Sequence, residues 1–310
     1  MSKTRFPPEW EACSDCTVPG PHDWNYCKHC GRPQRFPNVN AASAATRRAA
    51  LRQAYEAARQ AIAAQGNDAA RQQFEDQCNA SVAVLCTSVE KLEPMLVGYR
   101  DLLARFDEMR LLRFDRPPRP GAPNWVVVRA ITEIALFQTD KYPGNYHYAA
   151  LSLDQKGLPH YGPVEIVLRT SMIAHRASLF RENSGWYVEL YGQKLPADSQ
   201  CRWEDRGQLC VVKHASALGQ PGAGQPWESL VLKSDGDPSG RTDVFVEVQI
   251  FGELTLHACE RVTLYRDRLP TDGRRKHDLA TGRGGTRLAV MRERAAEIQV
   301  NGQPLEFQIA

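Results

Sequence analysis

Four cysteines near the start of the chain constrain its fold more than any other feature of the sequence. They form two Cys-x-x-Cys pairs, Cys13 with Cys16 and Cys27 with Cys30, separated by ten residues. Each pair can direct two thiolates at one ion, and two pairs complete a tetrahedral zinc site with Zn–S bonds of about 2.3 Å. Because so short a segment buries little core, a bound metal would supply most of its folding free energy. The spacing therefore predicts structural Zn²⁺ in a zinc ribbon over residues 1–37.

The predicted zinc site is structural because four thiolates leave no open coordination position. A redox Cys-x-x-Cys pair is the alternative, but redox chemistry needs only one pair. The module resembles short zinc ribbons and Ran-binding-protein-type fingers, with Trp10 before the first cysteine and Asn25 near the third. In those fingers the asparagine lies earlier, where this chain has residues 19–21, Pro-Gly-Pro. The resemblance leaves single-stranded RNA, a protein partner and the chain's own helices open as docking targets.

The other five cysteines are scattered, and the total of nine is odd. The first ten residues lack the apolar core of an export signal. Together these features argue against a disulfide framework and predict a cytoplasmic protein. No apolar run reaches the roughly 18 residues of a membrane-spanning helix, so no membrane partner is expected. The net charge of +3 is too small to indicate nucleic-acid binding by itself.

Residues 39–115 have a helical composition and predict an antiparallel helical hairpin. Alanine and arginine, two strong helix formers, dominate residues 41–65, and Gly66 with Asn67 interrupts the pattern. A weak apolar stripe marks the first helix, at Leu51, Tyr55, Ala58 and Ile62. The second helix is expected to carry a heptad seam formed by Cys78, Val82, Leu85, Val89 and Leu92. Packing the two stripes together gives the hairpin.

Residues 122–310 follow a proline-rich linker at 116–123 and predict a β-rich domain. The expected strands are Trp125–Leu136, Val164–Arg169, Ala177–Arg181, Trp186–Tyr191, Leu209–Lys213, Ser229–Lys233, Val244–Phe251 and Arg261–Tyr265. Because no long helices alternate with these strands, a doubly wound parallel sheet is not expected. The predicted fold class is α+β, with three units: zinc ribbon, helical hairpin and β-rich domain.

Familiar nucleotide-binding and hydrolase motifs are absent from the sequence, including GxxxxGK[ST], GxSxG and HExxH. Residues 268–287 carry six arginines and lysines among glycines. Such a segment is either a solvated basic loop or a phosphate-binding segment for nucleic acid.

Four stretches within residues 125–265 carry a resemblance to known proteins. They are Val126–Ala130 with its arginine, Gly157–Leu168 with a Tyr-Gly turn, His175–Ser184 with an Asn-Ser turn, and Phe245–Leu256 with Val-Glu-x-Gln. This order resembles a bacterial domain family found among toxin-like proteins. The succession of arginine, serine and glutamate is similar to that of mono-ADP-ribosyltransferases.

The resemblance implies a split β-sandwich that binds NAD and a toxin or effector, of the kind used in phage defence, that transfers ADP-ribose to a protein or nucleic-acid acceptor. It also implies an antitoxin or chaperone partner. Cleavage of the nicotinamide–ribose bond develops an oxocarbenium-like cation, which a nearby carboxylate stabilises. By resemblance, Glu247 is that carboxylate, Arg129 holds the NAD phosphates, Ser178 is the strand serine, and Gln249 orients the acceptor from the same strand face. The candidate NAD contacts are Arg129, His147, Tyr148 and Tyr161.

The sequence departs from the transferase pattern at two places. Phe245 occupies the position where transferases of this order usually have glutamate or glutamine, two residues before the catalytic glutamate. Arg176-Ala177-Ser178 stands where a Ser-Thr-Ser motif is usual.

Alternative interpretations of the same residues remain open. Glu247 and Gln249 fit the solvent face of an amphipathic strand, and Arg129 fits an ion pair at a strand end. His147 fits an aromatic cluster in a turn, and residues 160–162 fit a structural turn. The alternative function is a non-enzymatic zinc-ribbon adaptor that binds protein or single-stranded RNA. A nuclease is a third possibility, which would require divalent-metal-dependent cleavage.

Overall fold

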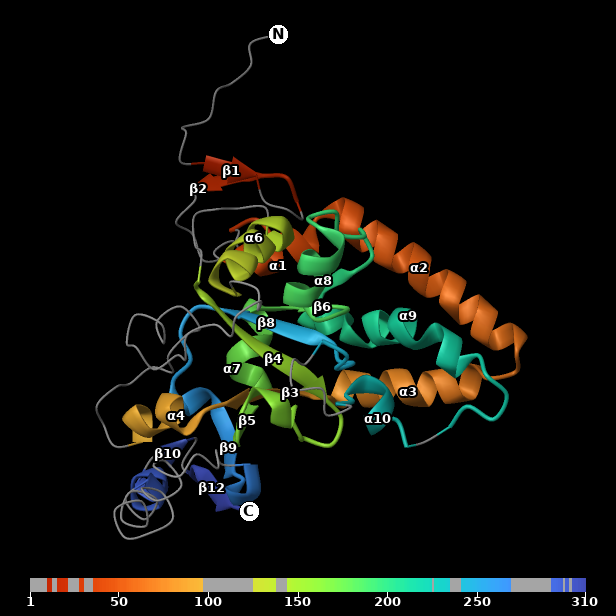
Figure 1. The fold of residues 1–310 in the computed structure, drawn as a ribbon. Helices are drawn as coiled ribbons and strands as arrows, with labels where there is room; N and C mark the ends of the chain where they lie inside the picture. Colours follow the sequence, from red (N-terminus) through yellow and green to blue (C-terminus); the bar gives the residue numbers. More distant parts are fainter. Residues whose placement is uncertain are drawn as a thin grey trace.

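The computed structural model describes residues 10–12, 16–21, 28–30, 36–96, 125–137, 144–224, 226–234, 241–268, 291–297, 299–300 and 303–310. This part of the chain is a mixed α/β structure built on an eight-stranded sheet (Figure 1). The coarse α+β prediction is therefore confirmed. The linker at 116–123, Cys13, Cys27 and most of the basic segment 268–287 lie outside the described residues.

The large sheet pairs segments that are far apart in the sequence. Its strands, in spatial order, are β12 (Glu306–Ile309), β9 (Cys259–Leu264), β5 (Val164–Leu168), β3 (Val82–Thr87), β4 (Tyr146–Ser152), β8 (Glu247–Phe251), β6 (Ala177–Phe180) and β7 (Gln200–Arg202). All neighbours are antiparallel except β12 and β9, which are parallel. Two small antiparallel pairs accompany it, β1 (Trp10–Ala12) with β2 (Pro19–Pro21) and β10 (Gln299–Val300) with β11 (Gln303–Pro304).

Helices cover both faces of the sheet. They are α1 (Pro37–Ser43), α2 (Ala45–Ala64), α3 (Asp68–Ala80), α4 (Val89–Leu96), α6 (Trp125–Phe137), α7 (Thr170–Ile173), α8 (Ser184–Tyr191), α9 (Arg206–Leu218) and α10 (Glu228–Val231). Short 3₁₀ turns η1 (Pro159–Tyr161), η2 (Ala174–Arg176), η3 (Trp203–Asp205), η4 (Leu256–Ala258) and η5 (Arg266–Arg268) connect them. In Figure 1, α2, α3 and α9 form one helical group, and α6 lies beside α8.

The two faces of the sheet bury different residues. On one face, α2, α3 and α9 join the main core with Val248 and Ile250 of β8 and with Val246, which directly precedes that strand. On the other face, Leu136 and Phe137 of α6 pack in a smaller cluster that Tyr146 and Phe180 complete. The segments predicted as a helical hairpin and as a β-rich domain therefore contribute to one sheet and one main core.

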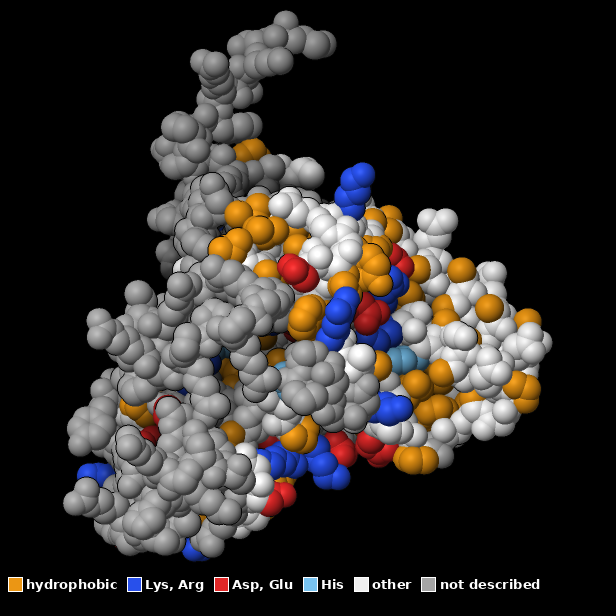
Figure 2. Space-filling view, in the orientation of Figure 1, with side chains coloured by type: hydrophobic (Ala, Val, Ile, Leu, Met, Phe, Trp, Pro, Cys, Tyr) orange, Lys and Arg blue, Asp and Glu red, His pale blue; other side chains and the backbone are white. Residues whose placement is uncertain are grey.

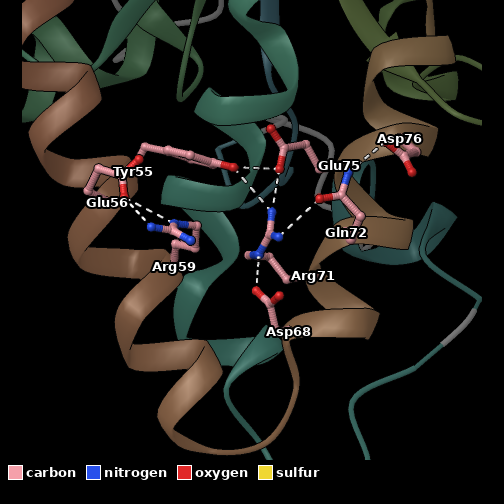
Figure 3. A network of polar contacts seen from close by, with 8 residues as sticks. All are labelled: Tyr55, Glu56, Arg59, Asp68, Arg71, Gln72, Glu75 and Asp76. Carbon is pink, nitrogen blue, oxygen red and sulfur yellow. Dashed lines mark hydrogen bonds and ion pairs between the residues drawn. The ribbon is translucent and has the colours of Figure 1, made fainter.

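The helices α2 and α3 are joined at Gly66, which adopts a positive φ of 78°. A polar network ties them together (Figure 3). Arg71 donates to Asp68 at 2.8 Å and to Glu75 at 2.5 Å, and the Tyr55 hydroxyl donates to Glu75 at 2.7 Å. Burial and the adjoining Glu75 carboxylate raise the pKa of Tyr55 to about 12, so this hydroxyl keeps its proton. The network holds the two helices side by side.

The predicted heptad seam is wrong beyond Cys78. α3 ends at Ala80, and the next residues form β3 in the middle of the large sheet. Ala83, Val84 and Leu85 are all buried, so β3 is covered on both faces. A short strand that is buried on both faces lacks the usual alternation of apolar and polar residues. The spacing of its apolar residues can therefore match that of a helical seam by coincidence.

Four predicted strands are helices in the structure. Trp125–Leu136 lies within α6, Trp186–Tyr191 within α8, Leu209–Lys213 within α9, and Ser229–Lys233 overlaps α10. In α6 the buried residues Val128, Thr132 and Leu136 recur every four positions, which is a helical period. Strands predicted around β5, β6, β8 and β9 are confirmed, whereas the sequence pattern does not predict β3, β4, β7 and β12.

A candidate active site around Glu247

The alternation of β8 places Glu247 and Gln249 on the sheet face that α6 and α8 cover. The neighbours Val246 and Val248 point the other way, into the main core. Glu247 is 1% exposed and Gln249 is 0% exposed. The interpretation of these two residues as the solvent face of an amphipathic strand is therefore wrong.

Three hydrogen-bond donors converge on the Glu247 carboxylate. Arg129 of α6 lies 3.4 Å from Oε2 through its Nη1 atom. The hydroxyl of Ser184, the first residue of α8, donates to Oε1. Gln249 Nε2 donates to the same Oε1 at 3.0 Å. The carboxylate is thus held by one cation and two neutral donors from three separate elements.

Arg129 lies between Glu247 and an aromatic ring. Its guanidinium carbon stands 3.9 Å from the centre of the Tyr148 ring, and Nη1 also donates to Ser184 at 3.1 Å. Burial lowers the pKa of Arg129, but Glu247 and the other acidic groups around it outweigh this effect and raise the pKa overall. Arg129 therefore remains a cation in contact with Glu247. Its side chain is 16% exposed, compared with 2% for Glu247.

Tyr148 on β4 is fixed by a second carboxylate. Its hydroxyl donates to Glu133 Oε1 at 2.6 Å, and the other oxygen of Glu133 accepts from the backbone N–H of Gly144 at 2.7 Å. Burial first, and the charge of Glu133 next, raise the pKa of Tyr148. The neutral ring therefore keeps its position against the Arg129 guanidinium.

A second layer of hydrogen bonds orients Gln249. Its Oε1 atom accepts from the Ser178 hydroxyl at 3.1 Å and from Gln200 Nε2 at 3.4 Å. Its backbone oxygen accepts from the Asn38 amide at 2.8 Å. With Oε1 occupied by donors, the amide nitrogen of Gln249 must face Glu247. Ser178, predicted as the strand serine, contacts Gln249 and not the carboxylate.

Ser184 is the site residue that sequence reasoning missed. The Asn183 side chain caps α8 by accepting from Trp186 N at 3.5 Å, which sets Ser184 at the start of the helix. Asn183 also donates to the Tyr161 hydroxyl at 2.9 Å. The available signal is the Asn-Ser turn itself, because such a pair is typical of a helix start.

Tyr161 borders this cluster from η1 and is 40% exposed. Burial of its hydroxyl raises its pKa; Arg129 lowers it and Glu247 raises it, so both charges act on this ring. Its ring meets that of Phe245 edge-on, with centroids 6.2 Å apart. Tyr161 therefore lies at the more exposed side of the residues around Glu247.

His147 does not share the face of these residues. In the register of β4 with β8, His147 lies opposite Ile250, whereas Tyr148 lies opposite Gln249. Because adjacent strand residues point to opposite faces, His147 is directed toward the main core. It is 4% exposed. This position does not fit the predicted contact of His147 with NAD.

The structure describes two of the four predicted zinc ligands, Cys16 and Cys30. β1 and β2, which precede and follow the first Cys-x-x-Cys pair in the sequence, are antiparallel. Four thiolates are the donors that structural zinc prefers. Cys16 is partly exposed and Cys30 is exposed, so neither belongs to the hydrophobic core. Among the described residues, no group of three or more metal-ligating side chains occurs.

Comparisons with known proteins give no family assignment. A scan against protein-family models finds no match to this sequence, and a search of curated proteins finds none either. Of the helices that the structure describes, none has both the length and the apolar character needed to cross a bilayer.

Proposed function

We propose that this chain is an ADP-ribosyltransferase-like toxin or effector that uses NAD to modify a protein or nucleic-acid acceptor. The observation that supports the proposal is the convergence of Arg129 and Ser184 on one buried carboxylate, Glu247. These donors lie 118 and 63 residues from Glu247 in the sequence. In this proposal the domain is an ADP-ribosyltransferase-like variant of the split β-sandwich.

Each residue around Glu247 has a role in the proposed chemistry. Loss of nicotinamide leaves positive charge on the ribose, and the Glu247 carboxylate, which is buried, would stabilise that charge. Arg129, the more exposed partner in a long 3.4 Å contact, would exchange Glu247 for the NAD diphosphate. Ser184 and Gln249 keep the carboxylate oriented while Arg129 changes partner. Tyr148 supports the guanidinium, and Tyr161 contacts the ligand at the exposed side.

The proposal includes a structural Zn²⁺ held by the four N-terminal cysteines. The zinc ribbon would recognise the acceptor, or an antitoxin or chaperone that restrains the protein. The proposed site of action is the cytoplasm, where reduced thiols remain available for zinc.

Transfer of label from NAD tests the proposed activity. The wild-type protein is incubated with NAD labelled in its adenylate part and with cell lysate, and labelled macromolecules are separated and counted. We expect Glu247→Gln to lower transfer at least about 100-fold, because it removes the charge that stabilises the transition state. Glu260→Gln, at an exposed position on β9, is the matched control and should transfer normally. Transfer that persists in Glu247→Gln would contradict the mechanism, and absence of any wild-type transfer would contradict the activity.

An exposed apolar surface favours the adaptor function as a second candidate. Val127 and Ile134 of α6 and Leu190 and Tyr191 of α8 are exposed, on two helices in contact. Figure 2 shows hydrophobic side chains at the surface in this part of the molecule. Apolar surface shared by neighbouring helices is typical of protein-binding sites. Stable binding of a protein partner that is lost in Ile134→Asp, together with no NAD consumption, would favour the adaptor over the transferase.

A further inference from the structure

Lys213 on α9 is a buried cation whose three donors are all used. Its side chain is 5% exposed. Nζ donates to the backbone oxygen of Arg181, to the Glu182 carboxylate at 2.8 Å and to the backbone oxygen of Phe245 at 3.0 Å. An ammonium group has three N–H donors, so these contacts satisfy it completely.

The acceptors of Lys213 lie directly upstream of the two residues that meet in the candidate site. Arg181 and Glu182 precede Ser184 in the turn that leads from β6 into α8, and Phe245 is two residues before Glu247. The last paired residues of β6 and β8 are Phe180 and Glu247. Beyond that pair the two strands make no further ladder contacts, and Lys213 bridges the two chain segments at the point where pairing stops.

Burial of an ammonium group is costly, and packing alone does not require it. Desolvation lowers the pKa of Lys213, and the neighbouring Glu182 opposes that shift. A methionine would fill the same space without that cost. What methionine cannot do is hold two backbone oxygens of different segments at a fixed separation.

We propose that Lys213 is a positioning residue that holds the Ser184 hydroxyl against the Glu247 carboxylate by clamping the segments before β8 and α8. The catalytic consequence rests on the proposed transferase function, whereas the structural consequence does not. A misplacement of about 1 Å in a catalytic group costs up to about 100-fold in rate. Loss of the clamp should therefore lower kcat more than it changes KM.

Lys213→Met and Arg71→Met form a matched pair for the test. Both substitutions remove a buried cation that links two segments. Arg71 donates to Tyr55 of α2 and to Glu75 of its own helix α3 (Figure 3). Neither α2 nor α3 supplies any of the three donors to Glu247 named above. The two full-length variants are compared at temperatures where each is equally folded. In NAD consumption, we expect Lys213→Met to lower kcat at least about tenfold with KM changed less than about twofold, and Arg71→Met to keep wild-type kcat. Equal kcat losses in both variants would overturn the proposal.

Hydrogen exchange separates this inference from the proposed activity. We expect amides in residues 181–187 and 243–249 to exchange faster in Lys213→Met than in wild type, and to stay unchanged in Arg71→Met. Lys213→Arg keeps a charged donor and should restore part of the protection; it also serves if the methionine variant fails to fold. If these amides exchange faster in Lys213→Met but the wild-type protein consumes no NAD, the result would support the positioning role of Lys213 and reject the transferase function. Unchanged exchange at both segments would reject the clamp.

Discussion

His214, beside Lys213 on α9, is buried in a T-shaped contact with the Phe74 ring, with ring centroids 5.8 Å apart. Burial first, and the charge of Lys213 next, lower the pKa of His214 to about 3. The folded chain therefore holds this imidazole neutral, whereas the unfolded chain protonates it near pH 6.5. A histidine with a depressed pKa contributes stability that is present above pH 6.5 and lost as pH falls toward 3.

We therefore expect the free energy of unfolding of His214→Leu to fall less than that of the wild-type protein as the pH is lowered below 6.5. Across pH 6.5 to 3 the wild-type protein should lose about 4 to 5 kcal/mol through this residue, by the linkage of proton binding to folding. Denaturant unfolding at several pH values measures the free energy of unfolding for both proteins. If the two profiles remain parallel below pH 6.5, His214 does not control acid stability.

Residue types and their order in the sequence predict part of the candidate site. The resemblance to mono-ADP-ribosyltransferases predicts Glu247, Gln249 and Arg129, and the structure brings these three side chains together. His147 is wrongly grouped with them because the sequence does not reveal which of two adjacent strand residues faces which side. The sequence does not predict the role of Ser184, because an Asn-Ser pair at the start of a helix has the same local pattern whether or not the serine also belongs to a site. Side-chain direction depends on register, which long-range pairing determines.

At the scale of elements, Arg71 donates hydrogen bonds within α3 and to Tyr55 of α2. Its side chain is 5% exposed and that of its partner Glu75 is 12% exposed. Arg71→Met would leave the Glu75 carboxylate nearly buried without its cation. We expect a loss of about 3 kcal/mol in the free energy of unfolding, typical of a broken buried ion pair.

Chemical denaturation of Arg71→Met measures that loss. Arg59→Met is the control, because Arg59 pairs with Glu56 on the exposed surface of α2, where both side chains are about half exposed. An exposed pair contributes little, so this variant should change stability by less than about 1 kcal/mol. Equal effects of both substitutions would show that the buried network does not stabilise the hairpin.

The elements differ in how well local sequence predicts them. α2 has an alanine-rich composition, which predicts its helix correctly. α6 is rich in β-branched and aromatic residues, which favour strands, yet it is a helix because its apolar face packs against β4 and β6. β3 has the pattern of a continued α3 because apolar residues bury equally well in either form. Tertiary packing, and not local propensity, determines whether such a short apolar segment forms a helix or a strand.

At the scale of the whole molecule, the described parts of residues 39–115 and 122–310, which the sequence predicts as two domains, share one sheet. The zinc ribbon stays a prediction. We expect purified protein to contain about one zinc per chain and Cys27→Ser to lose it, since three thiolates bind the ion far less tightly.

Metal analysis by mass spectrometry and thermal unfolding check this expectation together. Because Cys16 and Cys30 lie outside the hydrophobic core, Cys27→Ser should leave the main unfolding transition nearly unchanged. Cys259→Ser is the control, since Cys259 belongs to the main core and should affect stability without changing zinc content. Undiminished zinc in Cys27→Ser would contradict the four-cysteine site.

The central position of β3 has a consequence for how the chain reaches its native state. Both strands that flank β3, namely β4 and β5, follow it in the sequence, across the long stretch between residues 96 and 144. During synthesis the ribosome therefore releases an apolar segment well before its pairing partners exist. Non-local pairing of this kind slows folding and leaves strand edges open to association with other chains. We therefore expect this sheet order to make the chain depend on chaperones during expression and to lower its refolding yield at high protein concentration.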